Sequence, residues 1–250
     1  MGLIEGDDLL AVALSDVAAL GTDRDRDQVT AIGDRLRSAR LRVLVAGEAK
    51  RGKSTLVNAF LGQPVLPVGV TPVTAVATTV RYGDSALAEV RFADGHEERH
   101  PYAALDDLVT ERGNPANRRG IASVAVYVDA PVLADGVELV DTPGTGSVFA
   151  WDTEAAHDAL ETMDAAVFVL TADPPVSAGE QDLLRKVAKL SVRTFVVLNK
   201  ADYLDEAGLA EAVGFTQRVL AEVPGPADWA GASGAVYPMS ARAALTPAGD

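Results

Sequence analysis

Apolar residues along the chain follow two different periods. Short apolar runs predict buried strands, whereas apolar residues spaced three or four apart predict amphipathic helices. The predicted strands are 41–46, 75–82, 86–92, 97–100, 121–128, 137–140, 165–171, 192–198 and 236–239. The predicted helices that lie among them are 55–61, 101–112, 153–163, 177–190 and 209–223. Because strands and helices alternate over most of the chain, the pattern predicts an α/β fold with a mostly parallel sheet and helices on both faces.

The segment from 75 to 100 breaks this alternation, since its strands follow one another without a helix between them. Asp94-Gly95 stands between two of these strands and is a strong β-hairpin signal. We therefore expect the two strands within 75–92 to pair antiparallel, and we expect this part of the chain to form an antiparallel edge of the sheet.

Residues 1–40 carry a helical pattern of their own. The apolar residues that recur there at helical spacing are Leu10, Leu14, Val17 and Leu20, followed by Val29, Ile32, Leu36 and Ala39. These two sets predict a hairpin of two amphipathic helices. Two interpretations remain open: a docked N-terminal extension, or a segment of a helical bundle whose other parts lie elsewhere. The expected division is a helical segment 1–40 followed by an α/β domain 41–250.

The charge balance narrows the possible partners. The 250 residues carry a net charge of −14 and include no cysteine. Nucleic-acid binding needs clustered Lys and Arg, so we expect no nucleic-acid surface and no broad basic face for anionic lipid. The lack of cysteine excludes disulfides and thiolate metal sites. No apolar run approaches the roughly 20 residues of a membrane-spanning helix, and the first residues do not resemble a signal peptide, so we expect a cytoplasmic protein.

The loop after the first predicted strand matches a phosphate-binding pattern. It reads Gly47-Glu48-Ala49-Lys50-Arg51-Gly52-Lys53-Ser54 and fits G-x-x-x-x-G-K-[ST]. The glycines let successive N–H groups point at phosphate oxygens, next to the positive end of a helix. Lys53 is expected to reach the β- and γ-phosphates, and the Ser54 hydroxyl is expected to ligate Mg²⁺. Together with Thr55, these residues are the predicted phosphate-binding set.

Asp141-Thr142-Pro143-Gly144 follows the predicted strand 137–140. An acidic residue at a strand end beside a phosphate-binding loop stands where an Mg²⁺-organising aspartate belongs, so Asp141 joins Ser54 as a candidate metal-binding residue. The Gly144 N–H is expected to meet a γ-phosphate. The glycine- and serine-containing stretch 145–152 suits a loop that changes with the nucleotide state.

Asn199-Lys200-Ala201-Asp202 follows the predicted strand 192–198 and indicates which base is bound. Guanine offers acceptors at N7 and O6 and donors at N1 and N2; an Asn amide suits the first edge, and the Asp202 carboxylate can accept from both donors. The Lys200 stem can lie across the ring. Adenine presents the reverse pattern, so the carboxylate rejects it. After the last predicted strand, Ser240 and Ala241 are expected in a small-residue loop whose Ala241 N–H contacts the guanine O6.

Taken in order, the motifs GEAKRGKS, TPVT, DTPG, NKAD and SA resemble those of translational-type GTPase domains. More specifically, they resemble the dynamin superfamily and its bacterial dynamin-like proteins. Three features carry this closer resemblance: the long interval between Lys53 and Asp141, the segment 66–76 that contains TPVT, and the strand end at 171–175. The resemblance covers about residues 41–245, and it likens residues 1–40 to the bundle segment next to the GTPase (G) domain.

The candidate catalytic residues are Lys53, Thr74, Gly144, Lys50 and Thr71, of which the resemblance implies Thr74 and Thr71. Thr74 would be the switch threonine that meets Mg²⁺ and the attacking water, and Thr71 is the alternative register. Eukaryotic dynamins carry a Gln and a Ser in the phosphate loop that help to position water and a monovalent cation, whereas Ala49 and Lys50 stand there in this chain. Lys50 either replaces that cation or is a solvated loop lysine. Without the Gln, slow basal GTP hydrolysis is expected.

Two functional hypotheses follow from the resemblance. In the first, two G domains pair across the nucleotide face, as a homodimer or with a paralogue, and GTP hydrolysis drives membrane remodelling. Lipid would then be contacted at the inner face of the cell membrane by parts absent from this sequence. In the second, the protein is a nucleotide-gated regulatory interaction module in which slow hydrolysis acts as a timer. Because the family normally continues into a helical stalk, we expect these residues to be a fragment of a longer protein.

Overall fold

The computed structural model describes residues 40–69, 76–142, 162–173, 176–189, 193–223 and 235–245. The chain divides after Arg40 into two units, 1–40 and 41–250, of which the second contains almost all of the described residues. The predicted helical hairpin in 1–40 lies outside the described residues, as does nearly all of the predicted helix 153–163. Both therefore stay predictions.

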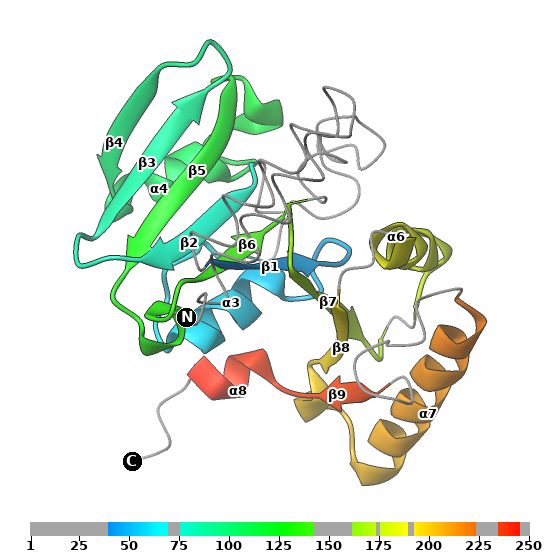
Figure 1. Cartoon of the computed structure of the whole chain (residues 1–250). Helices are drawn as coiled ribbons and strands as arrows, with labels where there is room; N and C mark the ends of the chain where they lie inside the picture. Colours follow the sequence, from blue (N-terminus) through cyan, green and yellow to red (C-terminus); the bar gives the residue numbers. More distant parts are fainter. Residues whose placement is uncertain are drawn as a thin grey trace, which may run out of the picture. The chain divides into compact units, whose positions relative to one another are not determined.

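Within the described ranges, nine strands form one sheet (Figure 1). They are β1 (Leu41–Ala46), β2 (Thr78–Tyr82), β3 (Leu87–Phe92), β4 (Glu97–Pro101), β5 (Ile121–Val128), β6 (Val137–Asp141), β7 (Ala165–Thr171), β8 (Arg193–Asn199) and β9 (Val236–Pro238). Their order across the sheet is β4-β3-β5-β2-β6-β1-β7-β8-β9. The strands from β6 to β9 in this order are all parallel, which confirms the expected parallel arrangement.

The other half of the sheet contains the antiparallel edge. β3 pairs antiparallel with both β4 and β5. The predicted pairing of the two strands within 75–92 is wrong, because β5 lies between β2 and β3 and pairs parallel with β2. The long strand β5 carries three buried valines, Val124, Val126 and Val128. These side chains pack in one buried cluster with Val80 of β2 and Val90 of β3, so this strand order buries apolar surface.

Helices cover both faces of the sheet. The α-helices are α3 (Lys53–Leu61), α4 (Leu105–Val109), α6 (Ala178–Lys189), α7 (Glu206–Glu222) and α8 (Ala241–Leu245), and the 3-10 helices are η1 (Tyr102–Ala104), η2 (Pro115–Asn117), η3 (Pro131–Leu133) and η4 (Ala201–Tyr203). Leu56 of α3 packs in one buried cluster with Val167 of β7. Leu184 of α6 and Leu220 of α7 pack in another with Phe168. Successive residues of β7 thus face different layers, as the alternation of a strand requires.

Side-chain caps determine two of the helix boundaries. α6 begins after Ser177, whose Oγ accepts a hydrogen bond from the Glu180 N–H at 3.0 Å. α7 begins at Glu206, earlier than the predicted residue 209, because Oδ1 of Asp205 accepts from the Gly208 N–H at 2.8 Å. The predicted helix 101–112 is shorter than expected and ends at Val109. No helix in the described ranges is long and apolar enough to cross a membrane.

The carboxyl ends of the parallel strands meet at one edge of the sheet. Val45, near the end of β1, pairs with Asp141 at the end of β6. Thr171, at the end of β7, pairs with Asn199 at the end of β8. Open α/β sheets bind their ligands at this edge. The register therefore brings three of the predicted motifs to the same place, although they lie far apart in the sequence.

Candidate nucleotide-binding site

Two glycines shape the phosphate-binding loop between β1 and α3. Gly47 has a φ of +144°, and a Cβ there would lie 2.4 Å from the backbone oxygen of Val169 in β7. Gly52 has a φ of +90°, and a Cβ there would lie 2.4 Å from Nδ2 of Asn199. Any side chain would collide at either position, and the positive φ also favours glycine. The loop is therefore packed against the ends of two neighbouring strands.

Lys53 is the first residue of α3 and is 6% exposed. Its Nζ donates to the backbone oxygen of Glu48 at 3.0 Å, across the loop. Burial lowers the pKa of Lys53 below its usual value, while the negative charges of Asp141, Glu180 and Glu48 oppose that shift. Because this ammonium group has lost much of its hydration, an anionic ligand in the loop would stabilise it.

Ser54 and Asp141 bring together two of the three predicted metal-binding residues. Oγ of Ser54 donates to Oδ2 of Asp141 at 2.7 Å, and Asp141 is 1% exposed. Both side chains present oxygen atoms, which Mg²⁺ prefers, and neighbouring ligands on an octahedral Mg²⁺ lie about 2.9 Å apart. The two oxygens therefore fit such an ion. Thr74, the third predicted ligand, lies outside the described residues.

Asn199 links the phosphate loop to the last motif of the chain. It is 3% exposed; its Nδ2 donates to the backbone oxygen of Arg51 at 2.9 Å, and its Oδ1 accepts from the Ala241 N–H at 3.0 Å. The prediction of a small-residue loop at Ala241 is wrong, because Ala241 is the first residue of α8. Oγ of Ser240 accepts from the Ala243 N–H at 3.1 Å at the start of this helix. A contact of Ala241 with the guanine O6 stays a prediction.

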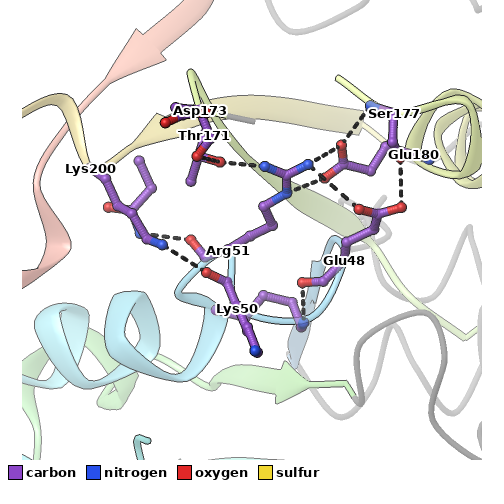
Figure 2. Close-up of polar contacts among 10 residues, drawn as sticks. Glu48, Lys50, Arg51, Thr171, Asp173, Ser177, Glu180 and Lys200 are labelled. Atoms are coloured by element: carbon purple, nitrogen blue, oxygen red, sulfur yellow. Dashed lines mark hydrogen bonds and ion pairs between the residues drawn. The ribbon is translucent and has the colours of Figure 1, made fainter. Parts of the chain in front are cut away.

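Lys200 and Asp202 lie on the turn that follows Asn199. Lys200 has a left-handed backbone conformation, with a φ of 63°. Its Nζ donates to the backbone oxygen of Lys50 at 2.9 Å, so its side chain reaches back to the phosphate loop (Figure 2). Asp202 lies in η4 and is exposed. Its carboxylate is thus accessible to a base, and it follows Lys200, whose side chain reaches the phosphate loop.

The Arg51 side chain leaves the loop in the direction of α6 (Figure 2). Its Nε and Nη2 donate to the two carboxylate oxygens of Glu180, each at 2.7 Å. Its Nη1 donates to Oγ1 of Thr171 at the end of β7. Arg51 is 3% exposed and Glu180 is fully buried. A buried ion pair with two parallel hydrogen bonds therefore joins the loop to the first turn of α6.

Glu48 makes a second contact with the same helix start. Its Oε1 accepts from Oγ of Ser177 at 2.6 Å. The Ser177 N–H in turn donates to Oε2 of Glu180 at 3.0 Å, which completes a capping box with the bond that begins the helix. Burial raises the pKa of Glu180, whereas the Ser177 N–H and the Arg51 guanidinium oppose that shift.

The α6 side of this arrangement was missed by sequence reasoning. The S-x-x-E spacing of Ser177 and Glu180 is a capping-box signal and indicates where the helix begins. It does not indicate a partner, and Arg51 lies 129 positions away from Glu180. Asn58 was missed as well: it is buried, and its Oδ1 accepts from the N–H groups of Val65 and Leu66, which hold the segment that follows α3.

The remaining predicted site residues differ in how far the structure describes them. Lys50 is exposed and has a φ of 65°, while Ala49 and Thr55 are partly buried in the loop and in α3. Thr71, Thr74 and Gly144 lie outside the described residues. Their expected roles at the γ-phosphate and at Mg²⁺ therefore stay predictions.

Known proteins resemble this chain over most of its length. An uncharacterised protein in the xynA 3′ region of Caldicellulosiruptor sp. (strain Rt8B.4) is 36% identical over 203 residues, which cover 81% of this chain and 49% of that protein. A bacterial dynamin-like protein of Nostoc punctiforme is 29% identical over 204 residues, with 75% of this chain and 29% of that protein covered. The chain thus spans about half or less of the length of these relatives.

Structural comparison agrees with the sequence relatives. The solved structure of an oligomerised bacterial dynamin pair, which is described as providing a mechanism for long-range sensing and tethering of membranes, has a TM-score of 0.67. The identity is 18%, and 96% of this chain and 39% of that chain are covered, so the likeness concerns the fold. The model of the dynamin family matches residues 43–201, which include the phosphate loop, Asp141 and Asn199. The protein belongs to the dynamin family.

Proposed function

We propose that this chain binds guanine nucleotide together with Mg²⁺ and hydrolyses GTP slowly. The observation that carries the proposal is the double contact of the buried Asn199 amide, with the phosphate loop at Arg51 and with the start of α8 at Ala241. The segments that would bind phosphate and base thereby belong to one site. Membership of the dynamin family supports hydrolysis as the reaction.

Asp202 selects the base in this proposal. Its exposed carboxylate accepts from N1–H and N2–H₂ of guanine. Adenine would bring the lone pair of its N1 against the carboxylate and would leave the carboxylate without a donor, which discriminates strongly. The stem of Lys200 lies along one face of the ring, because its ammonium group is held at the Lys50 carbonyl oxygen.

Ser54 and Asp141 hold Mg²⁺ in this proposal, and Thr74, or Thr71 in the alternative register, completes the set. The ion supplies positive charge that offsets the charge on the β- and γ-phosphates. Lys53 donates to the phosphate oxygens from its buried position, which restores the stabilisation that its ammonium group lost on burial. The Gly144 N–H donates to the γ-phosphate.

Slow turnover follows from the composition of the loop. The side chain of Ala49 has no hydrogen-bonding group with which to orient an attacking water. Lys50 is exposed at the loop surface, and its ammonium group places positive charge near the bond between the β- and γ-phosphates. This charge takes the place of a monovalent cation, so we expect the rate to be independent of K⁺.

The larger assembly is proposed from the family. G domains dimerise when nucleotide is bound, as a homodimer or with a paralogue, and hydrolysis is coupled to remodelling of a membrane at which the protein is peripheral. The likeness of fold to an oligomerised bacterial dynamin pair supports this proposal. We also propose that residues 1–40 contribute to a helical bundle and that other parts of the protein contact lipid. The alternative is a regulatory module that uses its switch state to gate a partner, with hydrolysis as a timer.

Phosphate release from saturating GTP, measured over a wide range of protein concentrations, tests the proposal. Specific activity that rises with protein concentration supports catalysis across a dimer. Constant specific activity overturns that mechanism and favours the regulatory module. The absence of any release above that of a Lys53→Ala variant contradicts GTP hydrolysis itself.

A further inference from the structure

The phosphate loop is held from two sides in different ways. On the β8 side, Asn199 and Lys200 bind backbone oxygens of the loop, at Arg51 and Lys50. Such contacts do not depend on which side chains the loop carries. On the α6 side, the contacts are made by side chains of the loop itself, and Figure 2 shows Arg51 paired with Glu180 and Glu48 bonded to Ser177. The second set therefore requires particular residues in the loop.

Stability alone does not account for a charged pair at this place. Removing two charges from water is costly, and apolar residues of similar volume often stabilise a fold as well or better. The pair fixes the Arg51 side chain in place, because a planar guanidinium with two parallel hydrogen bonds is held in both position and orientation. Thr171 adds a third fixed point on the far side of Arg51.

The contacts with α6 flank the most strained residue of the loop. Lys50 is not a glycine, yet it has a φ of 65°, a conformation that persists only where the surroundings enforce it. Glu48 on one side is bound to Ser177, and Arg51 on the other side is bound to Glu180. The Glu48 backbone oxygen also accepts from Nζ of Lys53, so the position of the loop determines that of the phosphate-binding lysine.

We propose that Glu180 is a positioning residue for phosphate binding. Acting through Arg51, and with Ser177 through Glu48, it holds the loop in the conformation in which Lys53 and the loop N–H groups face the nucleotide phosphates. This inference rests on the proposed nucleotide site, and it assigns a role in that site to α6, a helix that carries none of the nucleotide-binding motifs.

Glu180→Gln is the direct test, since Gln keeps the shape of the side chain but turns an –NH₂ group toward the Arg51 guanidinium. The dissociation constant of fluorescent N-methylanthraniloyl-GDP (mant-GDP) is expected to rise about tenfold, the factor that one strong hydrogen bond represents. The binding of a non-hydrolysable GTP analogue should weaken by the same factor, because both nucleotides use the same loop. The KM for GTP should rise while kcat changes by less than about twofold, as expected for lost ground-state binding.

Glu138→Gln is the matched control. Glu138 is also buried and also paired with arginines, with Nε of Arg81 at 3.0 Å and Nε of Arg42 at 3.4 Å. It lies near the start of β6 and pairs with Arg42 near the start of β1, whereas the loop follows the other end of β1. The same change of charge there should lower the thermal unfolding midpoint but leave the dissociation constant of mant-GDP unchanged.

The double variant Arg51→Met/Glu180→Met separates positioning from stability. It removes both charges together, so its thermal unfolding midpoint should return to the level of the unmodified protein or above it. If Glu180 positions the loop, the weakened binding of mant-GDP remains in the double variant. Recovery of affinity together with stability overturns the inference, as does unchanged affinity in Glu180→Gln. A lack of mant-GDP binding by the unmodified chain overturns the proposed function, and that result is distinguishable because it precedes any substitution.

Discussion

Several charged side chains are buried near the strand ends of the parallel half of the sheet, whereas most of those on β3 and β4 are exposed. At the strand ends of the parallel half, Lys53 is 6% exposed, Asp141 is 1% exposed and Glu180 is fully buried. On β3 and β4, Arg91 and Glu97 form an ion pair of 2.8 Å with their side chains 64% and 61% exposed. The two halves share one sheet but hold charge in opposite ways.

This difference indicates where the function lies. Buried charges are costly, so they are retained where pairing or ligand binding compensates for the lost hydration. Exposed ion pairs contribute little to stability, and on an edge strand their main effect is to discourage pairing with another sheet. The buried charges beside the loop between β1 and α3 therefore support the proposed nucleotide site, while the charges of β3 and β4 belong to an ordinary solvated edge.

Asp202→Asn is expected to produce the largest change at the parallel half. The Asn amide offers one acceptor and one donor, which no longer match the two donors of guanine but do match N1–H and O2 of xanthine. We expect GDP affinity to fall by at least about 100-fold and XDP affinity to rise. Competition against mant-GDP measures both effects.

The control for this substitution is Asp205→Asn. Asp205 lies close in the sequence and caps α7, where Asn caps a helix as well as Asp does. Its nucleotide selectivity should be that of the unmodified chain. Xanthine binding that appears in both variants would contradict the assignment of Asp202.

Lys53→Met should separate binding from stability. Loss of the ammonium group is expected to lower the affinity for GDP by about 100-fold, since charge-assisted contacts with phosphate are removed. Burial lowers the pKa of Lys53, which means that the ligand-free fold disfavours the charged form of this side chain. The charged form of Lys53 therefore lowers the stability of the ligand-free protein near neutral pH. The variant should therefore unfold at a higher temperature than the unmodified chain without nucleotide, and should gain no further stability from GDP. A lower midpoint in the ligand-free variant would contradict this account.

Lys50→Ala tests the proposal that the charge of Lys50 takes the place of a monovalent cation. We expect kcat at saturating GTP to fall about tenfold, with the dissociation constant of GDP unchanged, because the charge acts in the transition state. Addition of K⁺ should restore part of the rate in the variant and should not stimulate the unmodified chain. An unchanged kcat would identify Lys50 as a solvated loop residue.

The smallest effect is expected at the exposed edge. Arg91→Ala should change the free energy of unfolding by less than about 0.5 kcal/mol, as is usual for exposed pairs. Glu138→Gln, which leaves Arg42 and Arg81 facing a neutral group, should cost about 3 kcal/mol. Chemical denaturation measures both values. Similar costs for the two variants would remove the contrast between buried and exposed charge.

The contiguous parts of the site could be predicted from the sequence. The phosphate loop 47–54 and the motif 199–202 are each contiguous in the sequence. Their residue spacing therefore identifies them without knowledge of the fold. The parallel centre of the sheet was predicted for a similar reason, since the alternation of strands and helices constrains how strands can connect.

Non-local arrangements could not be predicted in this way. The position of β5 between β2 and β3 depends on which strand order buries the most apolar surface, and no local pattern specifies that order. The pairing of Arg51 with Glu180 likewise depends on the strand order that places β7 beside β1. Asp205, in contrast, is a capping residue that local rules indicate, so the start of α7 at Glu206 is predictable from the sequence.

Competition for mant-GDP tests the central claim, a guanine-selective nucleotide site, most directly. The unmodified chain is incubated with Mg²⁺ and mant-GDP, and unlabelled GTP or ATP is then added in increasing amounts. The account predicts that GTP displaces the probe at concentrations comparable to its own, while ATP fails to do so at about 100-fold excess, because Asp202 rejects adenine. Equal displacement by ATP and GTP, or no binding of the probe at all, would contradict it.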